Sequence, residues 1–236
     1  MPYRAPGVTG ARRAKKERND KTVIKIAPSI LSADFANLER DVKKVAEADW
    51  LHVDVMDGAF VPNLSIGIPV VQSLRKCTDM FLDVHLMIEK PVRYIEAFAK
   101  AGADLLSVHL EADHPTRIAE ALRVMDQCGV KKAVALRPIT SARAVLPYLE
   151  QLDMVLIMTV EPGFGGQAFM ADQMETVRQV RALIDRYNPA CDLEVDGGIS
   201  PKTAPVAIEA GANVLVAGSA VYGAADIPAA IRAMRG

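Results

Sequence analysis

Short apolar segments alternate with longer amphipathic segments along almost the whole chain, beginning near residue 24. Runs dominated by β-branched and other apolar residues predict strands over residues 24–31, 50–57, 81–87, 105–111, 133–137, 154–160, 193–196 and 214–217. Apolar residues spaced three or four positions apart predict helices over residues 35–48, 68–76, 94–101, 116–128, 142–151, 170–187, 201–210 and 227–234. Regular alternation of strands and helices is typical of an α/β protein with a parallel sheet.

Eight strand–helix units within a chain of 236 residues favour a single (β/α)₈ TIM barrel. A doubly wound open sheet is the alternative, but it needs a glycine-rich dinucleotide fingerprint after the first strand. Residues 27–31 read Ala-Pro-Ser-Ile-Leu and contain no glycine. We therefore predict one barrel domain over residues 23–236, without a linker or a second domain.

The first 22 residues differ in charge from the rest of the chain. They hold seven basic residues against two acidic ones, a net +5, so the remainder carries −6 of the overall −1. We expect residues 1–22 to be a disordered basic extension, and the acidic body disfavours nucleic acid as a partner. The sequence has no apolar run of about eighteen residues and no secretory leader. We expect a cytoplasmic protein that does not bind membranes.

Candidate metal ligands lie on several predicted strands. Side chains two positions apart share a face, which groups His52 with Asp54 on one strand and places His85 inward on the next. The strand over 193–196 ends in Asp196. Catalytic residues of barrels gather where the strands end, so these side chains, together with Asp83 and Glu194 on the same strands, predict one site. Two nitrogens and two carboxylates suit Zn²⁺, Fe²⁺, Mn²⁺ or Co²⁺, and one divalent ion is expected.

Each of these residues also has a plainer interpretation. A core histidine beside a solvated aspartate would explain His52 and Asp54 equally well if they stood alone. His109 and Glu111 form a rival pair two positions apart, which we interpret as structural because the other set is larger. Three methionines lie close to the proposed ligands and either line the pocket or pack in the core: Met56, Met87 and Met158.

Asp54 and Asp196 belong to strands two and seven, which approach the barrel interior from different directions. Two carboxylates on opposite sides of a flat intermediate could invert a carbon centre, one removing a proton and the other returning one. The alternative is that both are only metal ligands.

Glycines cluster in the loops that follow the last three strands. The loop at 161–167 reads Glu-Pro-Gly-Phe-Gly-Gly-Gln, Gly197-Gly198 follow the next strand, and Gly218-Ser219 follow the last. Glycine lets backbone N–H groups approach an anion, and barrels commonly bind phosphate beside their last strands. We predict a phosphate site there. The loop over residues 162–168 is either a mobile lid or an ordinary surface loop.

Several segments, taken in order, resemble ribulose-phosphate 3-epimerases. They are residues 27–35 (Ala-Pro-Ser-Ile-Leu-Ser-Ala-Asp-Phe), 52–58 (His-Val-Asp-Val-Met-Asp-Gly), 60–63 (Phe-Val-Pro-Asn), 83–87 (Asp-Val-His-Leu-Met), 161–167 and 194–198 (Glu-Val-Asp-Gly-Gly). The resemblance implies a barrel of the ribulose-phosphate-binding type. It implies an isomerase of the pentose phosphate and Calvin pathways that interconverts D-ribulose 5-phosphate and D-xylulose 5-phosphate through an enediolate. A homo-oligomer is also implied.

The resemblance assigns roles to individual residues. It implies His52, Asp54, His85 and Asp196 as ligands of one metal ion per subunit, with Asp54 and Asp196 also acting as acid and base. It implies that substrate is contacted by Ser29, His85, Gly163, Phe164, Gly165, Gly166, Gly197, Gly198, Gly218 and Ser219. The pocket-lining methionines it implies are Met56, Met87 and Met158.

Two positions depart from the family pattern. Ala59 stands where the family usually has histidine, and Ser65 stands where threonine is common. Neither position belongs to the metal or acid–base set, so these departures bear on turnover and loop packing. Two other functions are the alternatives: epimerisation of another ketose phosphate such as D-allulose 6-phosphate, and a non-catalytic barrel that binds sugar phosphates. A phosphosugar decarboxylase is disfavoured because no lysine lies between Asp54 and Asp57.

Overall fold

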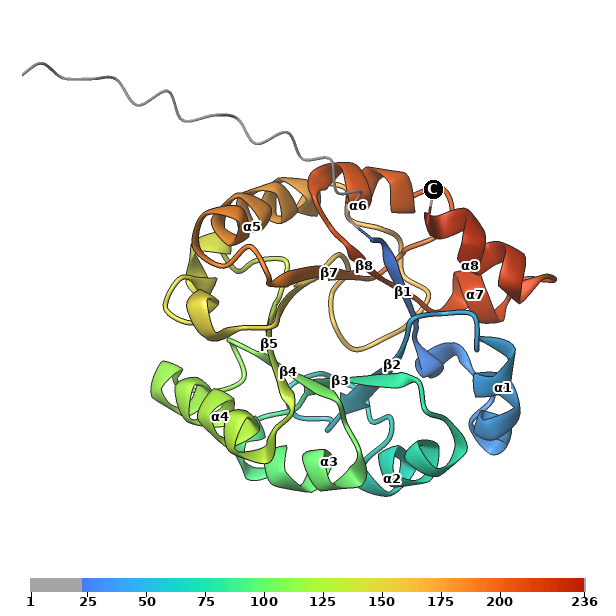
Figure 1. The fold of residues 1–236 in the computed structure, drawn as a ribbon, viewed down its shortest axis with the longest axis horizontal. Helices are drawn as coiled ribbons and strands as arrows, with labels where there is room; N and C mark the ends of the chain where they lie inside the picture. Colours follow the sequence, from blue (N-terminus) through green and yellow to red (C-terminus); the bar gives the residue numbers. More distant parts are fainter. Residues whose placement is uncertain (1–22, 236) are drawn as a thin grey trace, which may run out of the picture.

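The computed structural model describes residues 23–235, so the predicted extension over residues 1–22 lies outside the described residues. Eight parallel strands form the centre of the molecule (Figure 1). They are β1 (Lys25–Pro28), β2 (Trp50–Met56), β3 (Phe81–Met87), β4 (Leu105–His109), β5 (Lys131–Leu136), β6 (Met154–Met158), β7 (Asp192–Asp196) and β8 (Val214–Ala217). Their order is β1-β8-β7-β6-β5-β4-β3-β2, and a parallel bridge between Ser29 and His52 joins the two ends of the sheet. The predicted barrel is confirmed.

Helices surround the strands on the outside of the barrel (Figure 1). The α-helices are α1 (Leu38–Lys44), α2 (Ile68–Cys77), α3 (Ile95–Ala101), α4 (Pro115–Cys128), α5 (Gln173–Tyr187), α6 (Ala204–Ala210), α7 (Ser219–Tyr222) and α8 (Ile227–Arg235). Short 3₁₀ turns occur at Ile30–Ser32, Phe35–Asn37, Pro91–Arg93, Ala142–Val145 and Leu149–Gln151. No helix within residues 23–235 is long and apolar enough to cross a membrane.

Successive side chains along each strand point alternately outward and inward, and so belong to two separate apolar regions. Val53, Val55 and Val84 belong to the large core between the sheet and the helices. The residues between them face the barrel interior, where Trp50 and Leu105 join a second apolar cluster near the amino ends of the strands. Most polar side chains of the interior lie above that cluster, whereas Lys25 Nζ pairs with Asp192 beside Trp50 at the amino end. The apolar layer therefore forms the floor on which the candidate site is built.

Some predicted elements differ from the structure. The helix predicted over residues 142–151 is two 3₁₀ turns, because Pro147 cannot donate a backbone hydrogen bond and its ring would clash with the preceding turn. The strand predicted over residues 105–111 ends at His109, which leaves Glu111 in a turn. Helix α7 has only four residues, too few to produce a detectable periodicity.

Candidate active site

Strand register brings the predicted ligands together. β2 and β3 pair with His52 beside Asp83 and Asp54 beside His85, so two inward-facing rows lie next to each other. Asp196 ends β7, on the other side of β1 and β8. His52 and His85 are fully buried, and Asp54 is 4% exposed. The ion-binding candidates thus lie at the base of the open end of the barrel.

Their ligand atoms surround one point. Asp54 Oδ1 lies 3.2 Å from His52 Nε2 and 3.1 Å from His85 Nδ1. Asp196 Oδ2 lies 3.9 Å from each of the same two nitrogens. All four atoms lie within 4.8 Å of one another. A tetrahedral ion with bonds of about 2.1 Å separates its ligands by roughly 3.4 Å, so spacing and donor chemistry both fit a divalent metal. The buried cluster could therefore hold a metal ion.

Groups behind the two histidines determine which ring nitrogen faces that point. His52 Nδ1 lies 2.5 Å from Asp83 Oδ2, which leaves Nε2 toward the centre. His85 is turned the other way, with Nδ1 toward the centre and Nε2 2.9 Å from His109 Nε2. His109 Nδ1 lies 3.2 Å from Glu111 Oε2, and burial lowers the pKa of His109 to about 4.

The two aspartates differ in their electrostatics. Burial by itself would raise the pKa of Asp54, but the His52 and His85 rings beside it hold that pKa well below its usual range. Burial, and then the charge of Asp54, raises the pKa of Asp196 to about 6. Such separation of two neighbouring carboxyl groups is common where one acts as acid and the other as base.

Asp83 and Glu194 form a second polar layer beneath the four ligand candidates. Both are fully buried, and neither Glu194 oxygen has a hydrogen-bond donor among the described residues. Burial, reinforced by the charge of Asp83, raises the pKa of Glu194 well above its usual value. Alternation along β3 and β7 predicts that both residues face inward, but no sequence pattern indicates that Asp83 contacts His52.

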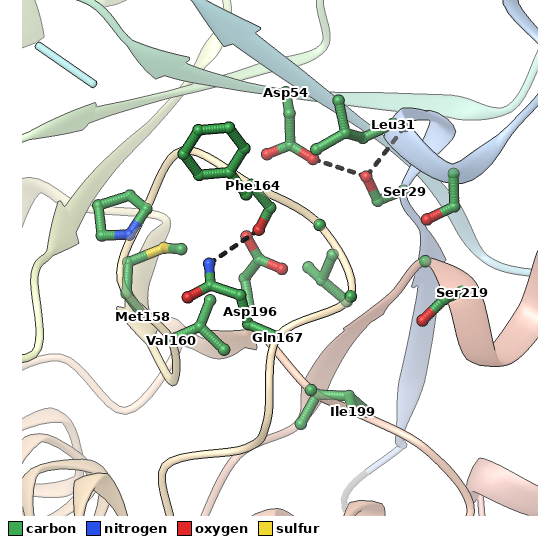
Figure 2. A pocket seen from close by; sticks show the side chains of 18 of the residues that line it. Ser29, Leu31, Asp54, Met158, Val160, Phe164, Gln167, Asp196, Ile199 and Ser219 are labelled. Atoms are coloured by element: carbon green, nitrogen blue, oxygen red, sulfur yellow. Dashed lines mark hydrogen bonds between the residues drawn. The ribbon is translucent and has the colours of Figure 1, made fainter. Parts of the chain in front are cut away.

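A cavity of about 280 Å³ opens directly above Asp54 and Asp196 (Figure 2). The predicted contact residues on its wall are Ser29, Met56, Met87, Met158, Gly163, Phe164, Gly165, Gly166, Gly197, Gly198, Gly218 and Ser219. His52 and His85 lie behind this surface. Further lining residues that we did not predict are Leu31, Ser32, Val160, Pro162, Gln167, Ile199, Ser200, Val216 and Ala220. All of them except Ser32 lie within two positions of a predicted contact, and that proximity in the sequence could have identified them.

Comparison with known proteins identifies the family. Residues 25–222 match the Ribulose-phosphate 3 epimerase family. The chain is 51% identical over 217 residues to ribulose-phosphate 3-epimerase of Bacillus subtilis (strain 168), which covers 91% of this chain and 99% of that protein. The chain belongs to the ribulose-phosphate 3-epimerase family. The cytoplasmic isoform of Oryza sativa subsp. japonica is 50% identical over 216 residues, with 89% and 92% coverage. The chloroplastic ribulose-5-phosphate-3-epimerase of Arabidopsis thaliana is 46% identical over 224 residues, with 94% and 80% coverage.

Solved structures of other barrels share the architecture of this epimerase. A 3-keto-L-gulonate-6-phosphate decarboxylase from Vibrio cholerae O1 superposes with a TM-score of 0.68 at 18% identity, over 91% of this chain and 96% of that one. A 3-hexulose-6-phosphate synthase from Salmonella typhimurium gives 0.67 at 18% identity, over 90% and 97%. At these identities the likeness shows the fold alone.

Glycines are required where the epimerase backbone approaches itself closely around the cavity. Gly198 has φ +66°, and a Cβ there would lie 2.5 Å from the backbone nitrogen of Phe169. Only glycine fits both conditions. Because side chains are absent at these positions, backbone N–H groups can form part of the cavity wall. Among the described residues that line the cavity, none is lysine or arginine.

The loop after β6 lines the cavity and is held by one hydrogen bond from outside the loop and by two within it. Asn63 Nδ2 donates to the Gly163 carbonyl at 2.8 Å. Gln167 Nε2 donates to the carbonyls of Glu161 and Phe164 at 2.6 and 2.9 Å. The Phe164 ring extends toward Asp54 and remains 55% exposed (Figure 2). That this loop moves as a lid stays a prediction.

The two departures from the family pattern have different surroundings. Ser65 Oγ donates to the Asp54 carbonyl at 2.6 Å and accepts from the Met56 N–H at 3.0 Å. Ser65 therefore supplies the hydroxyl that fixes the loop following β2 to that strand. Ala59 contributes its backbone N–H to Asp57 Oδ1 at 2.9 Å, a contact that is independent of the side chain.

Proposed function

We propose that this epimerase interconverts D-ribulose 5-phosphate and D-xylulose 5-phosphate by exchanging the proton on C3. The observation that supports this most directly is the position of Asp54 and Asp196. They reach one cavity floor from strands separated by β1 and β8, and their carboxylates lie beside the same two histidine nitrogens. A planar sugar intermediate that stood upright on that floor, between the two carboxylates, would have one of them on each face.

We further propose that His52, Asp54, His85 and Asp196 hold one divalent metal ion. The ion would act as a Lewis acid that stabilises negative charge developing on the sugar oxygens next to C3. Zn²⁺, Fe²⁺, Mn²⁺ and Co²⁺ all suit this donor set.

Asp54 is arranged to serve two purposes. Its Oδ1 faces the histidine nitrogens, while its Oδ2 accepts a hydrogen bond of 2.6 Å from Ser29 Oγ. The Ser29 hydroxyl therefore fixes the plane of the carboxylate. Asp196 has no such hydrogen bond among the described residues, and we assign it as the group that delivers the proton in this direction. In the reverse direction the two carboxyl groups exchange roles.

The substrate phosphate would lie at the other side of the cavity, against the backbone of residues 197–198 and 218–219. Backbone N–H groups bind anions without a cationic side chain, which agrees with the composition of the cavity wall. Met56, Met87 and Met158 contribute to the apolar part of that wall and would help to exclude water from the reacting carbon.

Other assignments receive less support. A six-carbon 6-phosphate would undergo the same chemistry, but relatives of about half identical sequence carry the ribulose-phosphate name. A non-catalytic binding barrel would have no use for four converging ligand atoms. Comparing kcat/KM for D-ribulose 5-phosphate and D-allulose 6-phosphate distinguishes the first alternative.

The decisive experiment measures metal content and solvent deuterium incorporation at C3 for the wild type and for Asp196→Asn. We expect about one divalent ion per chain and deuterium at C3 in the wild-type product. Loss of one general acid or base costs roughly 10²–10⁴ in rate, so Asp196→Asn should fall by at least that factor in epimerisation. Asp54 remains in this variant and should still exchange the C3 proton of one epimer, without inversion.

Asp192→Asn is the matched control. Asp192 begins the same strand at the opposite end of the barrel, where it accepts a 2.6 Å hydrogen bond from Lys25 Nζ. It should epimerise like the wild type. Near-normal inversion by metal-loaded Asp196→Asn would refute the two-carboxylate assignment, and a wild-type protein free of divalent metal would refute the metal site.

A further inference from the structure

His109 and Glu111 are buried or partly buried polar groups for which the proposed chemistry has no direct use. The His109 ring is fully buried and lies between two neighbours, with its centroid 5.0 Å from that of His85 and 4.8 Å from that of Phe60. The Arg137 guanidinium in turn lies 4.3 Å from the centroid of the Phe60 ring. Because both rings are fully buried, His85 Nε2 and His109 Nε2, which face each other, are kept away from solvent.

The hydrogen bonds around His109 and Glu111 have a defined direction, because Glu111 accepts all of those that it makes. Glu111 Oε1 accepts from the Arg137 N–H at 3.0 Å and from the Thr140 hydroxyl. Burial would raise the pKa of Glu111, but the His109 and Thr140 hydrogen bonds outweigh it and lower that pKa to about 2, so the carboxylate can only accept. His109 must then donate from Nδ1 to Glu111 Oε2, which leaves His109 Nε2 as an acceptor.

This direction of hydrogen-bond donation also determines how His109 and the proposed metal ligand His85 share a proton. His109 Nε2 and His85 Nε2 are 2.9 Å apart, a separation that requires one proton between them. With His109 accepting, His85 carries its proton on Nε2, and its Nδ1 lone pair faces Asp54 and the centre of the cluster. A ligating imidazole needs this lone pair.

We propose that His109, directed by Glu111, is a positioning residue that fixes His85 in the tautomer able to bind the metal. The two histidine ligands are then supported differently. His52 is held by the Asp83 carboxylate directly, whereas His85 is held by a second imidazole with the carboxylate one ring farther away. This inference rests on the proposed metal site, which the wild-type protein tests first.

The test uses Co²⁺, which substitutes for other divalent ions and shifts the proton signals of its ligands. Co²⁺ affinity is measured by competition with a chelator, and the imidazole N–H protons are observed as shifted, solvent-exchangeable NMR signals. The wild type should give two such signals, from His52 Nδ1–H and His85 Nε2–H. A wild type that binds no Co²⁺ overturns the proposed metal site, and a wild type that binds it in the absence of the second N–H signal overturns the positioning role alone.

Three variants separate hydrogen bonding from packing. Loss of an outer hydrogen-bond partner typically weakens metal binding about 10–100-fold, and we expect that loss in His109→Leu, with fast exchange of the His85 N–H signal. His109→Gln restores an acceptor near the Nε2 position and should recover affinity to within roughly threefold of the wild type. Ser107→Ala changes the same strand at a buried residue one step below and should match the wild type.

Glu111→Gln keeps the test decisive if His109→Leu does not fold, since the Glu111 side chain is 22% exposed. Glutamine can donate as well as accept, so it no longer fixes the direction, and we expect roughly threefold to tenfold weaker Co²⁺ binding with faster exchange of the His85 signal. Equal loss in His109→Gln and His109→Leu would overturn the proposal in favour of packing. Unchanged affinity and two unchanged signals in His109→Leu, or in Glu111→Gln, would also overturn it.

Discussion

Gly218→Ala tests whether the backbone after β8 binds the substrate phosphate. A Cβ at Gly218 would lie 2.5 Å from Ser32 Oγ and 3.8 Å from Ser29 Cβ, on the cavity wall. The Ser32 hydroxyl is the end of a flexible side chain and can rotate away, so the barrel should still fold. The added methyl group would instead keep an anion from approaching the N–H groups of residues 218–219.

The expected effect follows from the hydrogen bonds that are lost. A hydrogen bond to a charged group contributes about 1.5–3 kcal/mol, and 1.4 kcal/mol corresponds to a factor of ten. Weakening one such bond should lower kcat/KM for D-ribulose 5-phosphate by roughly 10–100-fold, mainly through KM. The same variant should leave the much slower reaction of unphosphorylated D-ribulose unchanged, because that substrate has no phosphate for residues 218–219 to bind.

The assay is steady-state kinetics with both substrates. Gly129→Ala is the control, because Gly129 follows α4 with φ +73° and its added Cβ meets no heavy atom within 4 Å. It should lower thermal stability slightly without changing KM. If Gly218→Ala shifts kcat/KM by less than twofold, or equally for both substrates, the phosphate does not bind at this position.

Three further predictions concern the loop, the metal and stability. Asn63→Ala removes the hydrogen bond to the Gly163 carbonyl, worth about 1 kcal/mol, and should lower kcat/KM roughly fivefold; an unchanged value would show that this bond does not matter for catalysis. Metal that binds only the folded chain should raise the free energy of unfolding by about 2.7 kcal/mol at a hundred times Kd, and denaturation curves with and without Co²⁺ measure this. Arg40 and Lys44 hydrogen-bond to Asp41 and hold its pKa below its usual range. Since the unfolded value is about 3.9, the ionised carboxylate stabilises the fold above about pH 4 and loses this effect as the pH falls. The stability difference between wild type and Asp41→Asn should therefore be smaller at pH 3 than at pH 7 in urea titrations, and an equal difference would contradict the assignment.

The fold could be predicted because strand and helix periods alternate without interruption through eight units. The convergence of His52, Asp54 and His85 followed from side-chain alternation on two adjacent strands, which needs no coordinates. Periodicity did not predict that residues 142–151 form two 3₁₀ turns instead of one α-helix, because Pro147 interrupts helical hydrogen bonding there.

The directions of the ring nitrogens were beyond sequence reasoning. Alternation shows that His85 and His109 face the barrel interior, but their nitrogens meet only because neighbouring strands are offset along the barrel axis. The role of Glu111 was similarly hidden, since it lies past the end of β4 in a turn rather than in the predicted strand. Tertiary geometry decides such contacts, and they are the basis of the positioning role that we propose for a pair interpreted from the sequence as structural.

The apolar cluster containing Trp50, Leu105 and Met154 closes the amino end of the barrel, and all three side chains are buried. Sugar, product and metal must therefore enter and leave by the same opening. If metal and substrate bind as proposed, a sugar phosphate would lie in the path of a departing ion, so the protein should lose its metal to a chelator more slowly during turnover than at rest. Substrate supply would then protect the enzyme from inactivation by metal loss.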